Sequence, residues 1–314
     1  MARDSTPRNP RIHAAAIHYF DAVRRAGSIR EAARRLNVAS SAVNRQVLKL
    51  EAEIGAALFE RLPGGLRLTA AGEVLARHVV TVLRDVERVR SDLDALEGLR
   101  AGHVELVTLE GFCHRIVPAA IAALRTRHPR ISVGARLLES GAIPGALLAG
   151  DAHLGLAFEV RRRPELRQLV TMQMPLGAVV RPDSPLAQHS FVTLRDCAAH
   201  PLVLPRGNFA NRDQLQPLLF QSGLAAQGQV EAGSVELIRQ LVLHGQGVAF
   251  MTRVGLEAEL ETGRLVHVPL RHEGKPVLST LGLYARAGHA QSGAAEAFAQ
   301  QVIAQLQSSP DKLL

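Results

Sequence analysis

Hydrophobic residues recur every three or four positions in two short runs near the start of the chain. Residues 28–36, "SIREAARRL", carry one apolar stripe and begin with Ser28, a residue that can cap a helix. Asn37 tolerates the left-handed backbone that ends a helix, so we expect a tight turn before a second run that begins near Ser40 or Ser41. The apolar stripe of that second run comprises Val43, Val47, Leu50 and Ile54. The pattern predicts two helices joined by a tight turn.

The outer side of the second predicted helix is polar. It carries Ser40, Ser41, Asn44, Arg45 and Lys49. In the major groove of DNA, an Arg side chain can donate two hydrogen bonds to guanine, and an Asn side chain can form two with adenine. The two helices are therefore interpreted as a helix-turn-helix whose second helix reads double-stranded DNA. The alternative is an ordinary pair of helices in a bundle.

The segment that follows favours DNA binding over a bundle. Residues 58–73, "LFERLPGGLRLTAAGE", place a Pro-Gly-Gly turn between two short alternating runs and predict a small hairpin. Such a wing presses on the phosphate backbone or enters a minor groove. The predicted DNA-contacting residues are Ser28, Ser40, Ser41, Asn44, Arg45, Lys49, Arg61 and Arg67.

An unbroken heptad pattern follows the hairpin. The apolar positions alternate in steps of four and three and comprise Leu75, Val79, Val82, Val86, Val89, Leu93 and Leu96. Thr69 is the expected N-cap, and residues 69–100 are predicted to form a linker helix with a coiled-coil seam. A second copy of the chain would cover this seam, so we expect a dimer and an imperfectly palindromic DNA target. The alternative is a helix that packs on its own chain.

Beyond residue 100 the pattern changes to alternating strands and helices. Helices are expected at 116–127, 143–149, 211–221, 235–244 and 294–306, between short apolar strands. This order predicts two α/β lobes with open, parallel-type sheets. Lobe 1 is expected at about 101–175 and 277–308, and lobe 2 at about 176–276. Ligands bind such sheets in a cleft between strand ends and helix N-termini.

Composition and charge add bounds to this picture. Of the formal net charge of +8, most lies in residues 1–68, with twelve Arg and Lys against six Asp and Glu, which suits an acidic polymer as partner. No secretory signal or membrane-spanning run is present, so we expect a cytoplasmic protein. Cys113 and Cys197 are interpreted as buried thiols. Catalytic, metal and cofactor motifs are missing, which argues against an enzyme, and a solute-binding transport protein is the other alternative.

The whole chain resembles a LysR-type transcriptional regulator. The resemblance is densest over "IHYFDAVRRAGSIREAARRLNVASSAVNRQVLKLEAEIGAALFERLPGGLRLTAAGE" and continues through "LLAGDAHLGLAF" and "GSVELIRQLVLHGQGVAFM". It implies an α/β protein overall: an α-rich winged helix-turn-helix (1–68), a coiled-coil linker helix (69–100) and a two-lobed effector domain (101–314) similar to periplasmic binding proteins. It also implies control by a small-molecule effector, and a homodimer or a tetramer built as a dimer of dimers.

Two departures from the family pattern affect its sites. The family usually has Ser, Gln and Pro where Ala39, Ser40 and Ser41 stand, so capping of the second helix is expected to pass to one of the two serines. In "VTLEGFC", Leu109, Glu110 and Gly111 replace the hydroxyl that often binds a ligand carboxylate. The base preference and the anion site are both expected to differ from those of relatives.

The resemblance also implies a set of effector-binding residues. They are Glu110, Gly111, Phe158, Glu159, Arg206, Asn208, Phe209 and Ser234. Two carboxylates in one cleft favour a cationic or donor group, because a buried unpaired carboxylate is costly. We therefore expect an amphoteric or amine-bearing metabolite rather than an aromatic carboxylate. In the alternative, Glu110 pairs with His114 or Arg115, and Glu159 pairs with Arg161.

Overall fold

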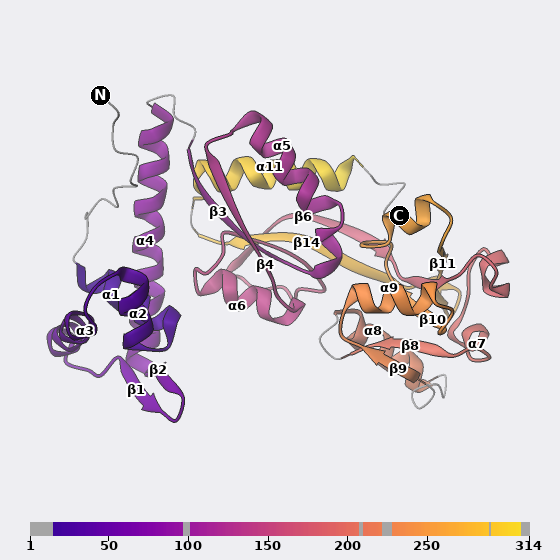
Figure 1. Cartoon of the computed structure of the whole chain (residues 1–314), viewed down its shortest axis with the longest axis horizontal. Helices are drawn as coiled ribbons and strands as arrows, with labels where there is room; N and C mark the ends of the chain where they lie inside the picture. Colours follow the sequence, from indigo (N-terminus) through magenta and orange to yellow (C-terminus); the bar gives the residue numbers. More distant parts are fainter. Residues whose placement is uncertain (1–14, 97–100, 207–209, 222–227, 289, 309–314) are drawn as a thin grey trace. The chain divides into compact units, whose positions relative to one another are not determined.

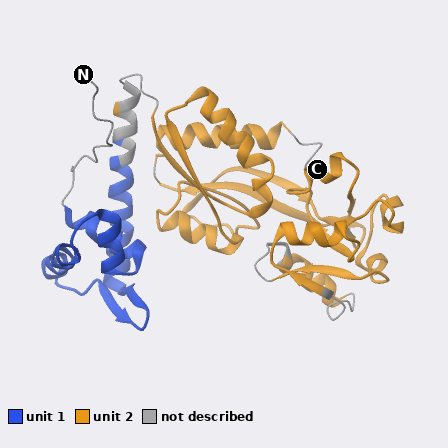
Figure 2. Ribbon diagram, in the orientation of Figure 1, with its two compact units in different colours: residues 1–90 blue, residues 91–314 orange. Residues whose placement is uncertain are grey.

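The chain forms two compact units, residues 1–90 and residues 91–314 (Figure 2). The computed structural model describes residues 15–96, 101–206, 210–221, 228–288 and 290–308 (Figure 1). Each unit has hydrophobic clusters of its own. No helix in these described ranges is long and apolar enough to cross a membrane.

The first unit is a winged helix-turn-helix. Its helices are α1 (Ala15–Ala26), α2 (Ile29–Leu36), α3 (Ser40–Ile54) and α4 (Ala70–Leu96), and its antiparallel strands are β1 (Phe59–Leu62) and β2 (Gly65–Leu68). The Ser28 hydroxyl caps α2 by accepting from the Glu31 amide, and Asn37 ends it with a φ of 54°. The predicted order of helix, turn, helix and wing is confirmed.

Helix α3 begins differently from the prediction. Its N-cap is Ala39, which makes no side-chain cap hydrogen bond, so the expected capping by Ser40 or Ser41 is wrong. Both serines lie in the first turn, Ser40 one position and Ser41 two positions too late to act as the cap. Val43, Val47 and Leu50 are buried as predicted.

The far end of α3 also departs from the predicted stripe. Ile54 was expected to be buried but is 44% exposed. It is the last residue of α3, directly before Gly55, whose left-handed φ of 76° ends the helix. The buried cluster under this helix extends only as far as Leu50.

Helix α4 uses its apolar stripe for two purposes. Thr69 caps it by accepting from the Gly72 amide at 3.1 Å, as predicted. Leu75 and Val79 pack with Phe20 of α1 inside the first unit. These two positions are therefore covered by their own chain, because α4 has to close the three-helix core, and the prediction of a seam open to a partner along its whole length is wrong there.

The second half of the α4 stripe is exposed. Val89 is 43% and Leu93 57% exposed, whereas Val86 is buried. The side chain of Leu96 lies outside the described residues.

Lobe 1 of the second unit is a five-stranded sheet in the order β4-β3-β5-β14-β6. The strands are β3 (Gly102–Thr108), β4 (Ile131–Leu137), β5 (Leu154–Phe158), β6 (Leu166–Pro175) and β14 (Leu278–Arg286). The helices are α5 (Ile116–Arg127), α6 (Ile143–Leu148) and α11 (Gly293–Gln307), with the 3-10 turns η1 (Glu110–Cys113) and η2 (Ser140–Ala142). β14 runs antiparallel to β5 and β6, so the sheet is mixed rather than parallel-type as expected.

Lobe 2 has a second five-stranded mixed sheet, in the order β11-β7-β10-β8-β9. The strands are β7 (Gly177–Val180), β8 (Leu202–Pro205), β9 (Gly228–Ala232), β10 (Val248–Met251) and β11 (Val266–Pro269). The helices are α7 (Leu194–Cys197), α8 (Ala210–Gln221), α9 (Val235–Leu243) and α10 (Glu257–Glu261), with the 3-10 turn η3 (Pro185–Gln188). A small hairpin, β12 (Arg271–His272) and β13 (Lys275–Pro276), precedes the return to lobe 1.

The chain passes between the lobes twice, at neighbouring points. β6 leads into β7 through Leu176, and β13 leads into β14 through Val277. The Leu176 amide donates to the Val277 carbonyl at 2.9 Å, so the two crossings are joined side by side. Both lie next to the lobe limits expected from the sequence.

Candidate functional site

The polar side of α3 is open to solvent. Ser40, Ser41, Arg45 and Lys49 are exposed and Asn44 is half-buried. Lys49 has a loose ion pair with Glu53, with 3.7 Å between Nζ and Oε1. Among the residues that the structure describes, neither Asn44 nor Arg45 has a side-chain partner. Their donors and acceptors are therefore available for base edges.

The wing is fixed to the helices by backbone contacts. The Leu66 amide donates to the Gly27 carbonyl at 2.8 Å, and a side chain at Gly65 would place its Cβ 2.6 Å from that same oxygen. The Glu51 carboxylate accepts from the amide of Leu58 at 2.7 Å. These contacts hold the hairpin at a defined angle to α3.

The residues predicted to contact phosphate differ in whether their side chains already have a partner. Arg67 lies opposite Glu60 across the hairpin, and the two form an ion pair with 2.7 Å between Nη2 and Oε1. Arg61 is exposed. Ser28 is half-buried, and its hydroxyl is engaged in capping α2. Arg61 is thus the more available of the two arginines.

The second unit contains a cavity of about 310 Å³ lined by both lobes. Most of its wall is apolar, with Leu109, Leu138 and Phe158 from lobe 1 and Val235 and Met251 from lobe 2. A cavity of this size with a few polar groups is typical of a small-molecule site.

The predicted effector-binding residues divide into three groups. Glu110, Gly111 and Phe158 line the cavity. Glu159, Arg206 and Ser234 are not part of its wall, and Asn208 and Phe209 lie outside the described residues.

Two of the residues outside the wall make contacts within their own lobes. Glu159 has a left-handed φ of 53°, and its carboxylate accepts from the Thr280 amide within lobe 1. It does not pair with Arg161. Arg206 is exposed, and its amide donates to the Ala232 carbonyl at 3.0 Å.

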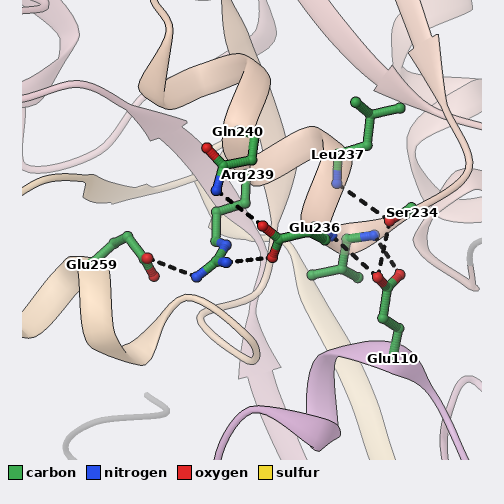
Figure 3. A network of polar contacts seen from close by, with 8 residues as sticks. Glu110, Ser234, Glu236, Leu237, Arg239, Gln240 and Glu259 are labelled. Atoms are coloured by element: carbon green, nitrogen blue, oxygen red, sulfur yellow. Dashed lines mark hydrogen bonds and ion pairs between the residues drawn. The ribbon is translucent and has the colours of Figure 1, made fainter.

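Glu110 makes the most extensive polar contact between the lobes (Figure 3). Its carboxylate accepts from the Ser234 hydroxyl at 2.9 Å, the Val235 amide at 2.7 Å and the Glu236 amide at 3.4 Å. All three donors belong to the N-terminus of α9. The alternative partner Arg115 pairs instead with Glu261 of lobe 2, with 2.6 Å between Nη1 and Oε1.

Further polar contacts lie along α9, and one of them joins it to α10 (Figure 3). Arg239 donates to Glu236 one turn earlier and to Glu259 of α10 at 2.7 Å. Gln240 donates to Glu236 at 2.9 Å, and the hydrogen bonds from Gln240 and Arg239 hold the pKa of the Glu236 carboxyl below its usual value. The helix whose N-terminus meets Glu110 is thus tied to α10 one turn further on.

Glu139 is a cavity residue that the sequence prediction missed. It follows β4, the neighbour of β3, and lines the cavity. Glu139 is exposed, and among the described residues its carboxylate has no hydrogen-bond or ion-pair partner. The available signal was its position, because the carboxyl ends of parallel strands meet at one edge of a sheet.

The two cysteines differ in exposure. Cys197 is buried, and burial raises the pKa of its thiol to about 12. Cys113 is exposed, so its interpretation as a buried thiol is wrong. It ends the short turn η1, which leaves its side chain outside the core that Phe112 enters. Within the described ranges, no group of three or more His, Cys, Asp and Glu could hold a metal ion.

Comparison with known proteins gives the same division of the chain. The family model of the LysR substrate binding domain matches residues 97–307, and that of the bacterial regulatory helix-turn-helix protein, lysR family, matches residues 15–73. The RuBisCO operon transcriptional regulator of Allochromatium vinosum is 28% identical over 292 residues, which cover 92% of this chain and 95% of the relative.

Solved structures share the fold over nearly the whole chain. A full-length OxyR variant from Pseudomonas aeruginosa has a TM-score of 0.74 at 19% identity, covering 93% of this chain and 95% of the other. Full-length CbnR in complex with its target DNA has a TM-score of 0.52 at 22% identity, covering 93% and 98%. With its two domains matched in order, the chain belongs to the LysR family of bacterial transcriptional regulators.

Proposed function

We propose that this regulator reads DNA through Asn44 and Arg45 of α3 and is controlled by a small effector that binds in the cavity between its lobes. The first part is supported by Asn44 and Arg45, which have no side-chain partner among the described residues: an exposed Arg beside a half-buried Asn matches the donor and acceptor pattern of the major groove. A regulator that acts on chromosomal DNA works in the cytoplasm, which is the location we propose.

A dimer is the assembly that best accounts for the exposed part of α4. Val89 and Leu93 lie four residues apart in the heptad pattern, on an exposed face of α4. A second copy of the chain would bury them there. Such a dimer presents two copies of α3, which favours an imperfectly palindromic target. Two dimers could then assemble into a tetramer.

The unpaired carboxylate of Glu139 carries the proposal for the effector's chemistry. Glu110 is satisfied by three donors of α9, so it gives no reason for a cation in the cavity. Glu139 is exposed and borders a mostly apolar cavity, where its carboxylate can accept a charge-assisted hydrogen bond from an N–H donor or an ammonium group of a bound ligand. We therefore propose an effector with an apolar body and an amine, which keeps the amine-bearing part of the prediction from sequence.

A thermal-shift screen of the full chain tests this effector class. Amines, amino acids and simple carboxylates are screened against the wild type and the Glu139→Gln variant. Amines with an apolar body should stabilise the wild type, and the substitution should weaken their binding about tenfold or more, since it removes a charge-assisted hydrogen bond.

Glu159→Gln is the matched control, because the Glu159 carboxylate bonds to its own sheet and not to the cavity. It should leave the amine response unchanged. Stabilisation by carboxylates alone, equal in wild type and Glu139→Gln, would contradict the proposed class.

A further inference from the structure

We propose that Glu110 is a built-in anion: a side chain of lobe 1 that occupies the anion position at the N-terminus of α9, joins the two lobes there and excludes ligand carboxylates from that position. This inference deepens the proposed function of the same cavity. It assigns Glu110 a role in ligand selection that differs from direct contact with an amine.

The arrangement of donors at α9 is that of an anion site. One hydroxyl and two consecutive backbone amides, from Ser234, Val235 and Glu236, converge on the two oxygens of a single carboxylate (Figure 3). The first amides of a helix have no partner within the helix, and the helix dipole favours negative charge at that end. A ligand carboxylate would seek the same three donors, which Glu110 already satisfies.

The contact closes one corner of the cleft between the lobes. Close to Glu110, a side chain at Gly111 would place its Cβ 3.3 Å from the Val254 carbonyl of lobe 2. Val254 itself packs in the same buried cluster as Phe112 of lobe 1. The ion pair of Arg115 with Glu261 adds a third contact from the same segment. The segment 110–115 therefore joins lobe 2 by charge, by packing and by close backbone approach.

The built-in anion also borders the cavity. Glu110 and Val235 are both part of its wall. A ligand in the cavity could therefore reach the donors of α9 with a carboxylate, but only by displacing Glu110. Displacement would leave the Glu110 charge without its three donors, which is costly for a partly buried carboxylate. Carboxylate ligands are therefore disfavoured at α9 as long as Glu110 is present.

Replacing Glu110 by Ala should convert the position into a binding site for free carboxylates. The substitution removes one carbon and the carboxylate, and acetate has the same atoms. The readout is hydrogen–deuterium exchange at the amides of residues 235–236 in the full chain. Exchange there should become at least about tenfold faster in Glu110→Ala, since each amide loses a charged acceptor. Acetate should restore the protection, and acetamide, which is neutral and equal in size, should not.

Glu110→Gln is the matched control, because it keeps the volume of the side chain and leaves no room for acetate. Acetate should change the exchange of residues 235–236 neither in this variant nor in the wild type. The proposal is overturned if acetate fails to restore protection in a folded Glu110→Ala protein, or if it protects the wild type or Glu110→Gln as well as Glu110→Ala. If Glu110→Ala does not fold, the test uses Glu110→Gln without acetate. Exchange at residues 235–236 equal to that of the wild type would then overturn the proposal. No DNA or effector enters this test, so its failure leaves the proposed function standing.

Discussion

Arg45 projects from α3 into solvent without a partner among the residues that the structure describes. We expect Arg45→Ala to weaken binding to a selected target by about 1–3 kcal/mol, because a bidentate contact to a base is lost. Binding to random DNA should weaken much less, because there the substitution removes only one contact between a positive charge and a phosphate. A selection from random DNA sequences provides the target, and a gel-shift titration measures both affinities.

Arg125→Ala is the control for charge, because Arg125 is an exposed residue of α5 in the other unit. It removes the same charge and should leave binding to the selected target close to that of the wild type. Equal losses for both variants would mean that Arg45 contributes charge and not base recognition.

The cavity shows which residue-level features the sequence could predict. The end of the first strand of lobe 1 was identified correctly, and Glu110 lies there. Its partner Ser234 is 124 positions away, and no local pattern reports such a pairing. Glu159 was misplaced because its left-handed backbone, which is uncommon outside glycine, turns the carboxylate towards Thr280.

At the scale of single elements, α4 combines an internal and an external apolar face. We expect Val89→Asp together with Leu93→Asp to produce monomers, because charges would enter the seam between two copies. Sedimentation velocity measures the change. Val74→Asp is the control, since Val74 is 61% exposed on the same helix but lies outside the heptad pattern. A double variant that sediments like the wild type would remove this face from the dimer contact.

Strand β11 carries a titratable group that ties the stability of lobe 2 to pH. His267 donates through Nε2 to the Met251 carbonyl at 3.0 Å, and burial, together with the nearby Arg253 charge, lowers its pKa to about 4. The unfolded chain therefore takes up a proton at higher pH than the folded chain. Stability should be full above about pH 6.5 and should be lost as the pH falls towards 4.

The loss should be at most about 3 kcal/mol, because part of the His267 side chain stays in contact with solvent. His267→Gln keeps a donor for the carbonyl and cannot titrate, so its stability should fall less steeply over the same pH range. Urea unfolding followed by circular dichroism at several pH values measures both curves. Parallel curves for wild type and variant would assign the pH dependence to other groups.

Elements with strong local signals were predictable, and those defined by distant partners were not. Helix α5 has the predicted bounds, because its apolar spacing is complete within twelve residues. Strand β6 was missed: polar residues interrupt its sequence, "LRQLVTMQMP", and it owes its register to β14, more than a hundred positions later. The apolar stripe of α4 is recognisable as a heptad from its spacing. Which of its positions pack inside the first unit and which stay exposed for a partner depends on tertiary packing, which the spacing does not encode.

On the scale of the whole molecule, the two compact units divide at residue 90, within α4, whereas the change of pattern near residue 100 predicts the start of the effector domain. Periodicity of 3.6 gives way there to strands, and the positive charge is concentrated before that point. The contact of the two lobes through segment 110–115 could not be foreseen, since it joins pieces of chain from different sheets.

The double crossing at Leu176 and Val277 sets the order in which the effector domain can be completed during synthesis. Lobe 2 is one continuous stretch of chain, whereas the sheet of lobe 1 has β14 between β5 and β6 and receives it only after the whole of lobe 2 has been synthesised. Lobe 2 can therefore leave the ribosome complete while lobe 1 still lacks an internal strand and α11. Until β14 is made, the facing edges of β5 and β6 would be unpaired, so the nascent chain is open to edge-to-edge pairing until that strand inserts.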